Sequence, residues 1–333
     1  MMSLFSGELP RERARNLMRR PICWHAMMWM AILTITPAGT MTTRAAKPPA
    51  RKSSRSSRPS TALPANVTEK LDVVYARYGK RELHLDLFSP SENAQRRSCL
   101  VVVHGGGWLK GNKSKFRALA LALAARGYVT AAIEYRLGGE ARFPAGIQDC
   151  NAAVRFLRAH ADRYGIDPRR IGAVGGSAGG HLVGLMATAP HVKAFQGNGG
   201  NPRQSSRLQA AVVMAGPLEL ATGPVADRSR KFPKRSNANR WLGKTIDEAP
   251  DLYRKASPIT YISEKTPPIL FMAGEQDHPE RNAATRSKLK ALNIETGIYV
   301  VKGARHGCWN RNPWFTPMVD RMDKFFSHTL HKR

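Results

Sequence analysis

A chain of 333 residues, 42% of them hydrophobic, can bury one large core, and we expect one folded domain behind an N-terminal extension. Its 53 Lys and Arg against 24 Asp and Glu give a net charge of +29, which would attract polyanions. That charge comes without zinc-type Cys/His spacing, a helix-turn-helix signature or an arginine-rich recognition helix. We therefore expect no nucleic-acid partner.

The first 60 residues carry eleven Lys or Arg against two Glu, and an apolar stretch follows Arg19 and Arg20. This stretch is too short and too interrupted for a comfortable membrane span. We predict a signal peptide over residues 1–45, hence an exported protein in the periplasm or outside the cell. An uncleaved membrane anchor is the competing interpretation. Residues 46–66 are rich in Pro, Ser and basic residues and predict a flexible, disordered linker, with the folded domain over 67–333.

The first half of this domain alternates between strand and helix patterns. A strand hairpin near 71–88 turns at Tyr78–Arg81, and a strand from Cys99 runs into three glycines. The further expected elements are a helix over 114–125 ended by Gly127, a strand over 128–135, a helix over 145–164, a strand over 170–174 and a helix over 178–189. This alternation predicts an α/β fold, with a mostly parallel sheet, helices on both faces and the antiparallel hairpin at one edge.

The second half begins with a Gly/Asn/Ser-rich segment, 191–207, which we expect to be a mobile surface loop. Residues 216–263 contain no clean strand, and we expect a small cap inserted above the functional site, where substrate preference would reside. The expected elements are strands over 208–215, 268–274 and 296–301, short helices over 237–242 and 248–255, and helices over 280–292 and 313–331.

Of four cysteines, Cys23 lies in the leader and Cys99, Cys150 and Cys308 lie in the domain. An odd number cannot all pair within the chain. We favour free thiols, because Cys99 opens an apolar strand and Cys150 falls on a helix. One disulfide in an oxidising compartment is the alternative.

The central motif is the G-x-S-x-G pentapeptide Gly175-Gly-Ser-Ala-Gly179, which joins a buried strand to a buried helix. A turn of this kind holds its serine in a strained conformation and packs the helix closely on the strand, so small neighbours are required. Ser177 is therefore our candidate nucleophile. A glycine-rich loop that only turns a corner is the alternative for the motif taken alone.

A serine hydroxyl needs a base to accept its proton and a carboxylate to orient that base. Asp277 follows one closing strand and His306 follows the next, where the loops at the carboxyl ends of parallel strands gather. We select these two residues. The rival acids are Glu275 and Asp251, and the rival bases are His104, His181 and His278; we expect His181 to be a packed helix residue and His104 to brace a loop.

The three glycines Gly105, Gly106 and Gly107 can expose backbone amides, because they carry no side chains. We expect the amides of Gly106, Gly107 and Ala178 to form an oxyanion hole, the set of donors that binds the negative oxygen of a tetrahedral intermediate. A strand-terminal turn would also account for the glycines. We expect neither a metal nor a cofactor.

These motifs resemble the α/β-hydrolase superfamily, and within it esterases of the hormone-sensitive-lipase type. The resemblance rests on His104-Gly-Gly-Gly-Trp108, Gly175-Gly-Ser-Ala-Gly-Gly-His181, Asp277 and His306-Gly307. Gly176 replaces the Asp that usually precedes the nucleophile there, and the motif is more similar to bacterial feruloyl and acetylxylan esterase-like (BD-FAE-like) proteins. Asp72-Val-Val-Tyr75, Glu134-Tyr-Arg-Leu137 and Phe143-Pro-Ala-Gly-Ile-Gln-Asp149 extend the match over about residues 70–330.

The resemblance implies a metal-free serine carboxylesterase acting on small or polysaccharide-linked acetyl or feruloyl esters. The basic surface would hold such an enzyme on an acidic polysaccharide or a cell envelope. Two alternatives stay open: a serine amidase or peptidase of the same fold, and a catalytically silent binding protein built on it. The sequence leaves the oligomeric state open.

Overall fold

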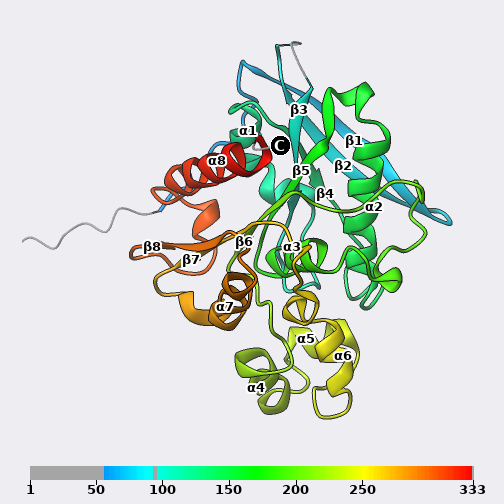
Figure 1. Ribbon diagram of the computed structural model, residues 1–333, viewed down its shortest axis with the longest axis vertical. Coiled ribbons are helices and arrows are strands. Elements are labelled where there is room, and N and C mark those ends of the chain that lie inside the picture. The colour runs from blue at the N-terminus through cyan, green and yellow to red at the C-terminus, as the bar shows by residue number, and fades with distance from the viewer. Residues whose placement is uncertain (1–55, 93–95, 332–333) are drawn as a thin grey trace, which may run out of the picture. The chain divides into compact units, whose positions relative to one another are not determined.

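Eight strands form one sheet with helices packed on both faces (Figure 1). The structure, a computed structural model, describes residues 56–92 and 96–331. The predicted signal peptide and the first part of the predicted linker lie outside these residues. The strands are β1 Val67–Tyr78, β2 Arg81–Pro90, β3 Arg97–Val103, β4 Val129–Ile133, β5 Ile166–Gly176, β6 Ala210–Met214, β7 Ile269–Gly274 and β8 Thr296–Val301.

The strand order is β1-β2-β4-β3-β5-β6-β7-β8. The pairs β1–β2 and β2–β4 are antiparallel and all later pairs are parallel. β1 lies at the sheet edge and pairs antiparallel with β2, which confirms the predicted edge hairpin. Gly79 lies in the tight turn between these strands with a φ of +60°. Because the strands from β3 to β8 run parallel, their carboxyl ends meet at one edge, where ligands bind in open α/β sheets.

The helices are α1 Arg117–Ala124, α2 Ala145–Ala159, α3 Ala178–Thr188, α4 Gly223–Lys231, α5 Asn237–Leu242, α6 Pro250–Lys255, α7 Ala283–Ala291 and α8 Phe315–His331. Shorter 3₁₀ turns are η1 Lys113–Phe116, η2 Asp162–Tyr164, η3 Lys193–Phe195, η4 Pro258–Tyr261, η5 Pro279–Asn282 and η6 Cys308–Asn310. α2, α3 and α7 pack on one face of the sheet, and α1 and α8 on the other (Figure 1). None of the helices in the described residues is long and apolar enough to cross a membrane.

The core lies on both faces of the sheet because successive side chains of a strand point to opposite sides. In β3, Cys99 and Val101 pack with α2 and α3, whereas Leu100 and Val102 pack with α1 and α8. Each fully buried aliphatic side chain contributes roughly 1.5–3 kcal/mol. A strand that is apolar on both faces therefore belongs at the sheet centre, which explains the uninterrupted apolar run of β3. Cys99, Cys150 and Cys308 are buried as free thiols.

The inserted segment between β6 and β7 forms α4, α5 and α6, which lie together at one end of the sheet (Figure 1). The sequence predicted α5 at its observed residues and α6 within two residues, but it did not predict α4. Only Ala226 and Ser229 are buried in α4, so its sequence lacks the apolar stripe that identifies a helix.

Side-chain hydrogen bonds join α2 to the segment 191–207, for which we expected a mobile surface loop. The Asn151 side-chain amide donates to Phe195 O at 2.8 Å, and Arg155 donates to Gln196 O at 2.8 Å and to Gly200 O at 3.1 Å. These bonds satisfy loop carbonyls with side chains from a distant helix. The Gly/Asn/Ser composition does not reveal such long-range partners.

Residues 56–66, the last part of the predicted linker, make hydrogen bonds to the domain. The amide of Asn312 donates to Ser57 O at 2.9 Å, and Arg117 donates through Nε to Thr61 O at 3.1 Å. Asn66 contacts Ala125 O through its side-chain amide at 3.3 Å. Ser57 and Thr61 make their contacts through backbone carbonyls, which every sequence carries, so a polar composition does not exclude such contacts.

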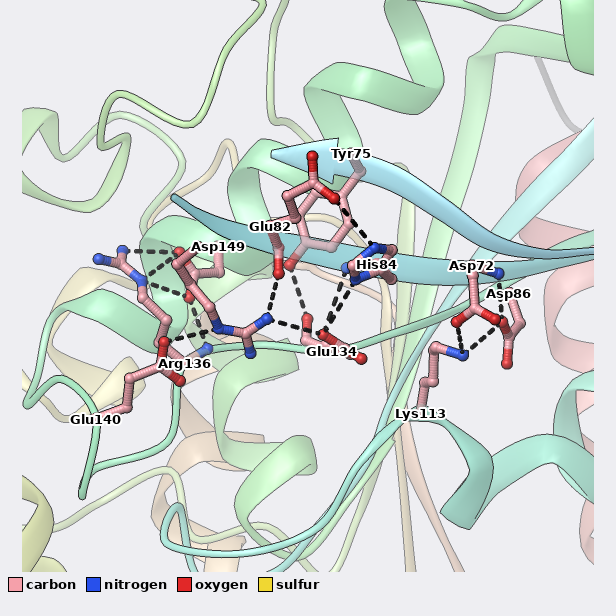
Figure 2. Close-up of polar contacts among 11 residues, drawn as sticks. Asp72, Tyr75, Glu82, His84, Asp86, Lys113, Glu134, Arg136, Glu140 and Asp149 are labelled. Carbon is pink, nitrogen blue, oxygen red and sulfur yellow. Dashed lines mark hydrogen bonds and ion pairs between the residues drawn. The ribbon is translucent and has the colours of Figure 1, made fainter. Parts of the chain in front are cut away.

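The three further motifs of the sequence match meet beside the hairpin (Figure 2). The Arg136 guanidinium donates to both carboxylate oxygens of Asp149, at 2.7 and 3.0 Å, and Asp149 is fully buried. The Tyr75 hydroxyl donates to Glu134 O at 2.7 Å. These contacts join α2 and β1 to the segment after β4, which gives the motif residues a structural role.

A second ion cluster in Figure 2 joins the hairpin to η1. Lys113 Nζ lies 2.8 Å from an Asp72 carboxylate oxygen and 2.7 Å from one of Asp86. Asp72 adopts a left-handed φ of +54° at an irregularity of β1, and its amide donates to Asp86 Oδ1 at 3.0 Å. The ammonium balances two carboxylates that would otherwise repel.

The start of α3 makes the closest backbone approach to the sheet. A Cβ on Gly179 would lie 2.1 Å from Val103 O, and one on Gly175 would lie 2.5 Å from Gly179 O. Real Cβ atoms do not approach backbone oxygens this closely, so only glycine lets α3 sit against the ends of β3 and β5. These glycines therefore set the position of the helix that follows Ser177.

We predict that Gly179→Ala destabilises the domain by about 3 kcal/mol, because overpacking against rigid backbone forces the helix to shift. Urea unfolding measures this change. Gly297→Ala is the control, since a Cβ there meets no atom within 4 Å, and it should be neutral or slightly stabilising. Equal stability of the two variants would contradict the packing argument.

Candidate active site

Ser177 lies between the end of β5 and the start of α3, with a φ of +57° and a ψ of −124°. A positive φ is strained for a residue with a side chain. The turn is held because the Ser177 amide donates to Met214 O at 2.8 Å and the His181 amide donates to Ser177 O at 3.0 Å. At Gly176 a Cβ would lie 2.8 Å from the Trp309 ring, so glycine is required there too.

Ser177, His306 and Asp277 form a continuous chain of hydrogen bonds at the carboxyl edge of the sheet. Ser177 Oγ lies 3.0 Å from His306 Nε2, and His306 Nδ1 lies 2.6 Å from Asp277 Oδ2. An ionised carboxylate only accepts, so Nδ1 carries a proton and Nε2 is free to accept the serine proton. The structure thus brings together the three residues selected from the sequence. The arrangement can activate a serine oxygen as a nucleophile.

Asp277 is 6% exposed and is held by a residue that the sequence did not single out. Arg281 donates to Asp277 Oδ1 at 3.0 Å and to Ala215 O at 2.5 Å. Burial by itself would raise the pKa of Asp277, but the hydrogen bonds and electrostatic attraction from His306 and Arg281 outweigh it and lower that pKa. Asp277 therefore stays ionised at neutral pH. No sequence motif marks Arg281.

The rival acids lie elsewhere. Glu275 accepts a hydrogen bond from the Gly303 amide at 2.8 Å, and Asp251 pairs with Arg254 on exposed α6. His278 is exposed and begins η5 with a left-handed φ of +47°. None of these residues contacts Ser177 or His306 among the hydrogen bonds and ion pairs of the described residues.

His104 is a buried residue that supports the glycine loop. Its Nδ1 donates to Gly105 O at 3.2 Å, and its ring stacks on Tyr135 with 4.4 Å between centroids. Burial lowers its pKa to about 4, so the ring is neutral near pH 7. The contacts agree with the bracing role expected from the sequence.

His181, on α3, connects the glycine loop to the inserted segment. The Trp108 indole donates to His181 Nδ1 at 3.2 Å, and His181 Nε2 donates to Ala256 O at 2.7 Å. Trp108 also stacks on Trp241 of α5 at 4.9 Å. Burial lowers the pKa of His181 to about 4. The sequence predicted a packed helix residue, and its role as a connector follows from long-range contacts alone.

The glycine loop adopts conformations that only glycine takes easily. Gly106 and Gly107 have φ values of +150° and +62°, and a Cβ on Gly106 would lie 1.7 Å from Lys110 O. In the described residues, no backbone hydrogen bond uses the amides of Gly106, Gly107 or Ala178 as donors. Gly107 and Ala178 line the cavity that contains Ser177, whereas Gly106 does not. The amides of Gly107 and Ala178 are therefore better placed than that of Gly106 to act as oxyanion donors.

A cavity of about 270 Å³ opens above Ser177 and His306. Trp108, Pro217 and Val225 form apolar walls, and Arg228 is also part of its lining. Two larger hollows, of about 810 and 970 Å³, contain neither Ser177, His306 nor Asp277 in their linings. Size alone would select them, but only the small cavity combines a nucleophile, a base and an apolar wall. In the described residues, no cluster of His, Cys, Asp and Glu could hold a metal ion.

We predict that His181 makes stability fall on acidification. Its pKa is about 4 in the folded chain against about 6.5 unfolded, so the unfolded state binds more protons between these values. The stability that neutral His181 contributes is fully present above about pH 6.5 and is lost as the pH falls towards 4. Between pH 7.5 and 5, His181 should account for about 2 kcal/mol of the loss.

Urea unfolding of wild type and His181→Gln at both pH values tests this. Glutamine can still accept from Trp108 and donate to Ala256 O, but it does not titrate. The variant should lose less stability on acidification. An identical loss in both proteins would contradict the assignment of a neutral buried ring.

Comparison with known proteins places this geometry in context. The BD-FAE family model matches residues 85–288. The chain belongs to the BD-FAE family. The match includes Ser177 and Asp277 and ends before His306. The fold is that of the α/β-hydrolases, as the motifs implied.

The chain is similar to curated and solved esterases. It is 32% identical over 218 residues to Esterase LipC of Mycobacterium tuberculosis, covering 62% of this chain and 52% of LipC. A carbohydrate esterase from gut microbiota, in truncated form, aligns with a TM-score of 0.72, 25% identity and coverage of 83% and 100%. Propionate-bound esterase 2 of Thermogutta terrifontis aligns with a TM-score of 0.65, 26% identity and coverage of 81% and 97%. The chain spans about half the length of the curated relatives it matches.

Proposed function

We propose that this chain is a serine carboxylesterase that acts through an acyl-enzyme. The observation that carries the proposal is the hydrogen-bonded chain from Ser177 through His306 to buried Asp277, in which Ser177 and His306 line a cavity with apolar walls. Esterase LipC and the two solved esterases support ester rather than amide hydrolysis.

The reaction begins when Ser177 Oγ attacks the ester carbonyl carbon while His306 Nε2 accepts the hydroxyl proton. The protonated His306 then donates this proton to the leaving alcohol oxygen, the carbon–oxygen bond breaks and the acyl group stays on Ser177. Water attacks the acyl-enzyme with His306 again accepting a proton. Return of that proton to Ser177 Oγ releases the carboxylic acid. Asp277 stays ionised and stabilises the charged imidazole.

The negative oxygen of each tetrahedral intermediate needs donors already in place. Gly107 and Ala178 line the cavity, and their amides donate to no backbone acceptor in the described part of the chain. Gly106, one residue earlier, supports this turn and is a further candidate. One such donor typically contributes 10²–10³ in rate, because it acts without reorganisation where charge develops.

The cavity favours a small acyl group. Its volume of about 270 Å³ lies just below the range of roughly 300–1,000 Å³ that is usual for ligand sites. Propionate and butyrate are bound in two of the similar Thermogutta terrifontis structures, and another neighbour is named as a carbohydrate esterase. We therefore place acetyl esters linked to carbohydrate first, and feruloyl esters second because of their bulk.

Two other activities fit the sequence less well. An amidase or peptidase would use the same three residues, but the named relatives are esterases. A silent binding protein would not need a strained serine aligned on a histidine and a buried carboxylate, since such strain persists only when the surroundings enforce it.

We predict that Ser177→Ala lowers the turnover of short-chain aryl esters by several orders of magnitude and leaves the fold intact. Rates on matched aryl acetates and anilides would separate esterase, amidase and silent protein. A fluorophosphonate should label Ser177 and no other residue. If Ser177→Ala keeps a tenth of the wild-type rate, the nucleophile is wrong.

We also propose that the protein is exported, with acidic polysaccharide or cell envelope as the surface that its positive charge would meet. The apolar stretch after Arg19-Arg20 and the net charge of +29 support this. A membrane anchor formed by an uncleaved leader is the alternative.

The export proposal predicts a mature N-terminus between about Gly39 and Lys47. N-terminal sequencing of the protein from its natural source decides this. An N-terminus at Met1 or Met18 in protein from the membrane fraction would favour the anchor. The same N-terminus in protein from the cytosol would overturn export.

A further inference from the structure

The cavity above Ser177 is lined by a cationic side chain that pairs with no acidic residue among those the structure describes. Three of its lining residues can carry positive charge: His306, Arg281 and Arg228. His306 and Arg281 are both bound to Asp277. Arg228, on α4, has no ion pair and no side-chain hydrogen bond in the described part of the chain, and its only ring contact is with Phe232 at 5.6 Å.

The other arginine of α4, Arg230, differs from Arg228. Arg230 lies 2.8 Å from Asp247 and 3.9 Å from Asp227, so it is paired twice. Asp227 is the direct neighbour of Arg228 in the chain but pairs with Arg230. The two arginines of α4 therefore differ in ion pairing, and of the two only Arg228 lines the cavity.

The surrounding sequence strengthens the positive field. The insertion carries no Asp or Glu between Arg228 and Ile246, and its cations there are Arg228, Arg230, Lys231, Lys234, Arg235, Arg240 and Lys244. Lys231 Nζ also lies over the Phe232 ring, 5.6 Å from its centroid. Of these seven cations only Arg228 lines the cavity. An excess of charge of one sign in the segment attracts ligands of the opposite charge.

We propose that Arg228 forms an anion-binding subsite beside Ser177, and that the preferred substrate is a small ester bearing a carboxylate. This inference rests on the proposed esterase function and names its substrate class. A guanidinium can bind a carboxylate through two parallel N–H···O bonds, which gives both attraction and orientation. The apolar walls hold the uncharged part of the substrate, while Arg228 fixes its charged end.

Two substrate pairs test the subsite and show where the anion lies. 4-Nitrophenyl hydrogen glutarate and its neutral methyl ester place the charge on the acyl side. 4-Acetoxybenzoate and the neutral 4-acetoxybenzamide place it on the alcohol side. Wild type should favour the anionic member of at least one pair in kcat/KM.

Arg228→Gln should lower kcat/KM for that anionic ester by about tenfold, the lower range for a hydrogen bond between charged groups, and leave its neutral partner within twofold. Arg230→Gln removes the same charge from the same helix and is the matched control. It should leave kcat/KM unchanged for both the anionic and the neutral ester. Arg228→Lys should restore part of the preference, because it keeps the charge but not the paired donors.

The outcomes separate this inference from the proposed function. Hydrolysis of both members of each pair at equal efficiency would overturn the subsite and leave the esterase intact. An equal loss on anionic and neutral esters in Arg228→Gln would also overturn it, since it would show a structural role for Arg228. No hydrolysis of any ester by wild type, with no fluorophosphonate labelling of Ser177, would overturn the esterase itself.

Discussion

The contact on which the rest of the molecule depends is the backbone approach between the start of α3 and the ends of β3 and β5. Gly179 faces Val103 O at a distance that leaves no space for a Cβ, and Gly175 faces Gly179 O in the same way. This approach forces the connecting residue, Ser177, into a positive φ. Backbone strain here places the serine oxygen above the sheet, where the loops after β7 and β8 reach it.

A second set of contacts joins this turn to the inserted segment. His181, one helical turn after Ser177, accepts from Trp108 of the glycine loop and donates to Ala256 beyond α6. Trp108 in turn stacks on Trp241 of α5. One set of buried contacts therefore supports the nucleophile, the oxyanion donors and the cavity walls. Movement of the insertion would displace the glycine loop through these contacts.

Charge is organised differently in the core and around the site. Buried carboxylates have defined cationic partners: Asp149 with Arg136, Asp86 with Lys113, and Asp277 with Arg281 and His306. These pairs avoid the cost of an isolated buried charge. In the insertion, Arg230 pairs with Asp227 and Asp247, whereas Arg228, which lines the cavity, has no ion pair among the described residues. The positive charge of Arg228 is thus available to a ligand in the cavity.

The sequence alone determined the elements whose signal is local. The apolar runs of β3, β5 and β7 predict buried strands, the glycines around Ser177 predict a tight strand-to-helix turn, and strand-end positions predict that Asp277 and His306 approach the serine. Tertiary structure decided what depends on distant partners: Arg281 behind Asp277, His181 between Trp108 and Ala256, the anchoring of 191–207 and 56–66, and α4 with its unpaired Arg228. Side-chain periodicity is written along the chain, but a hydrogen bond or ion pair between residues far apart in sequence exists only when folding brings them together.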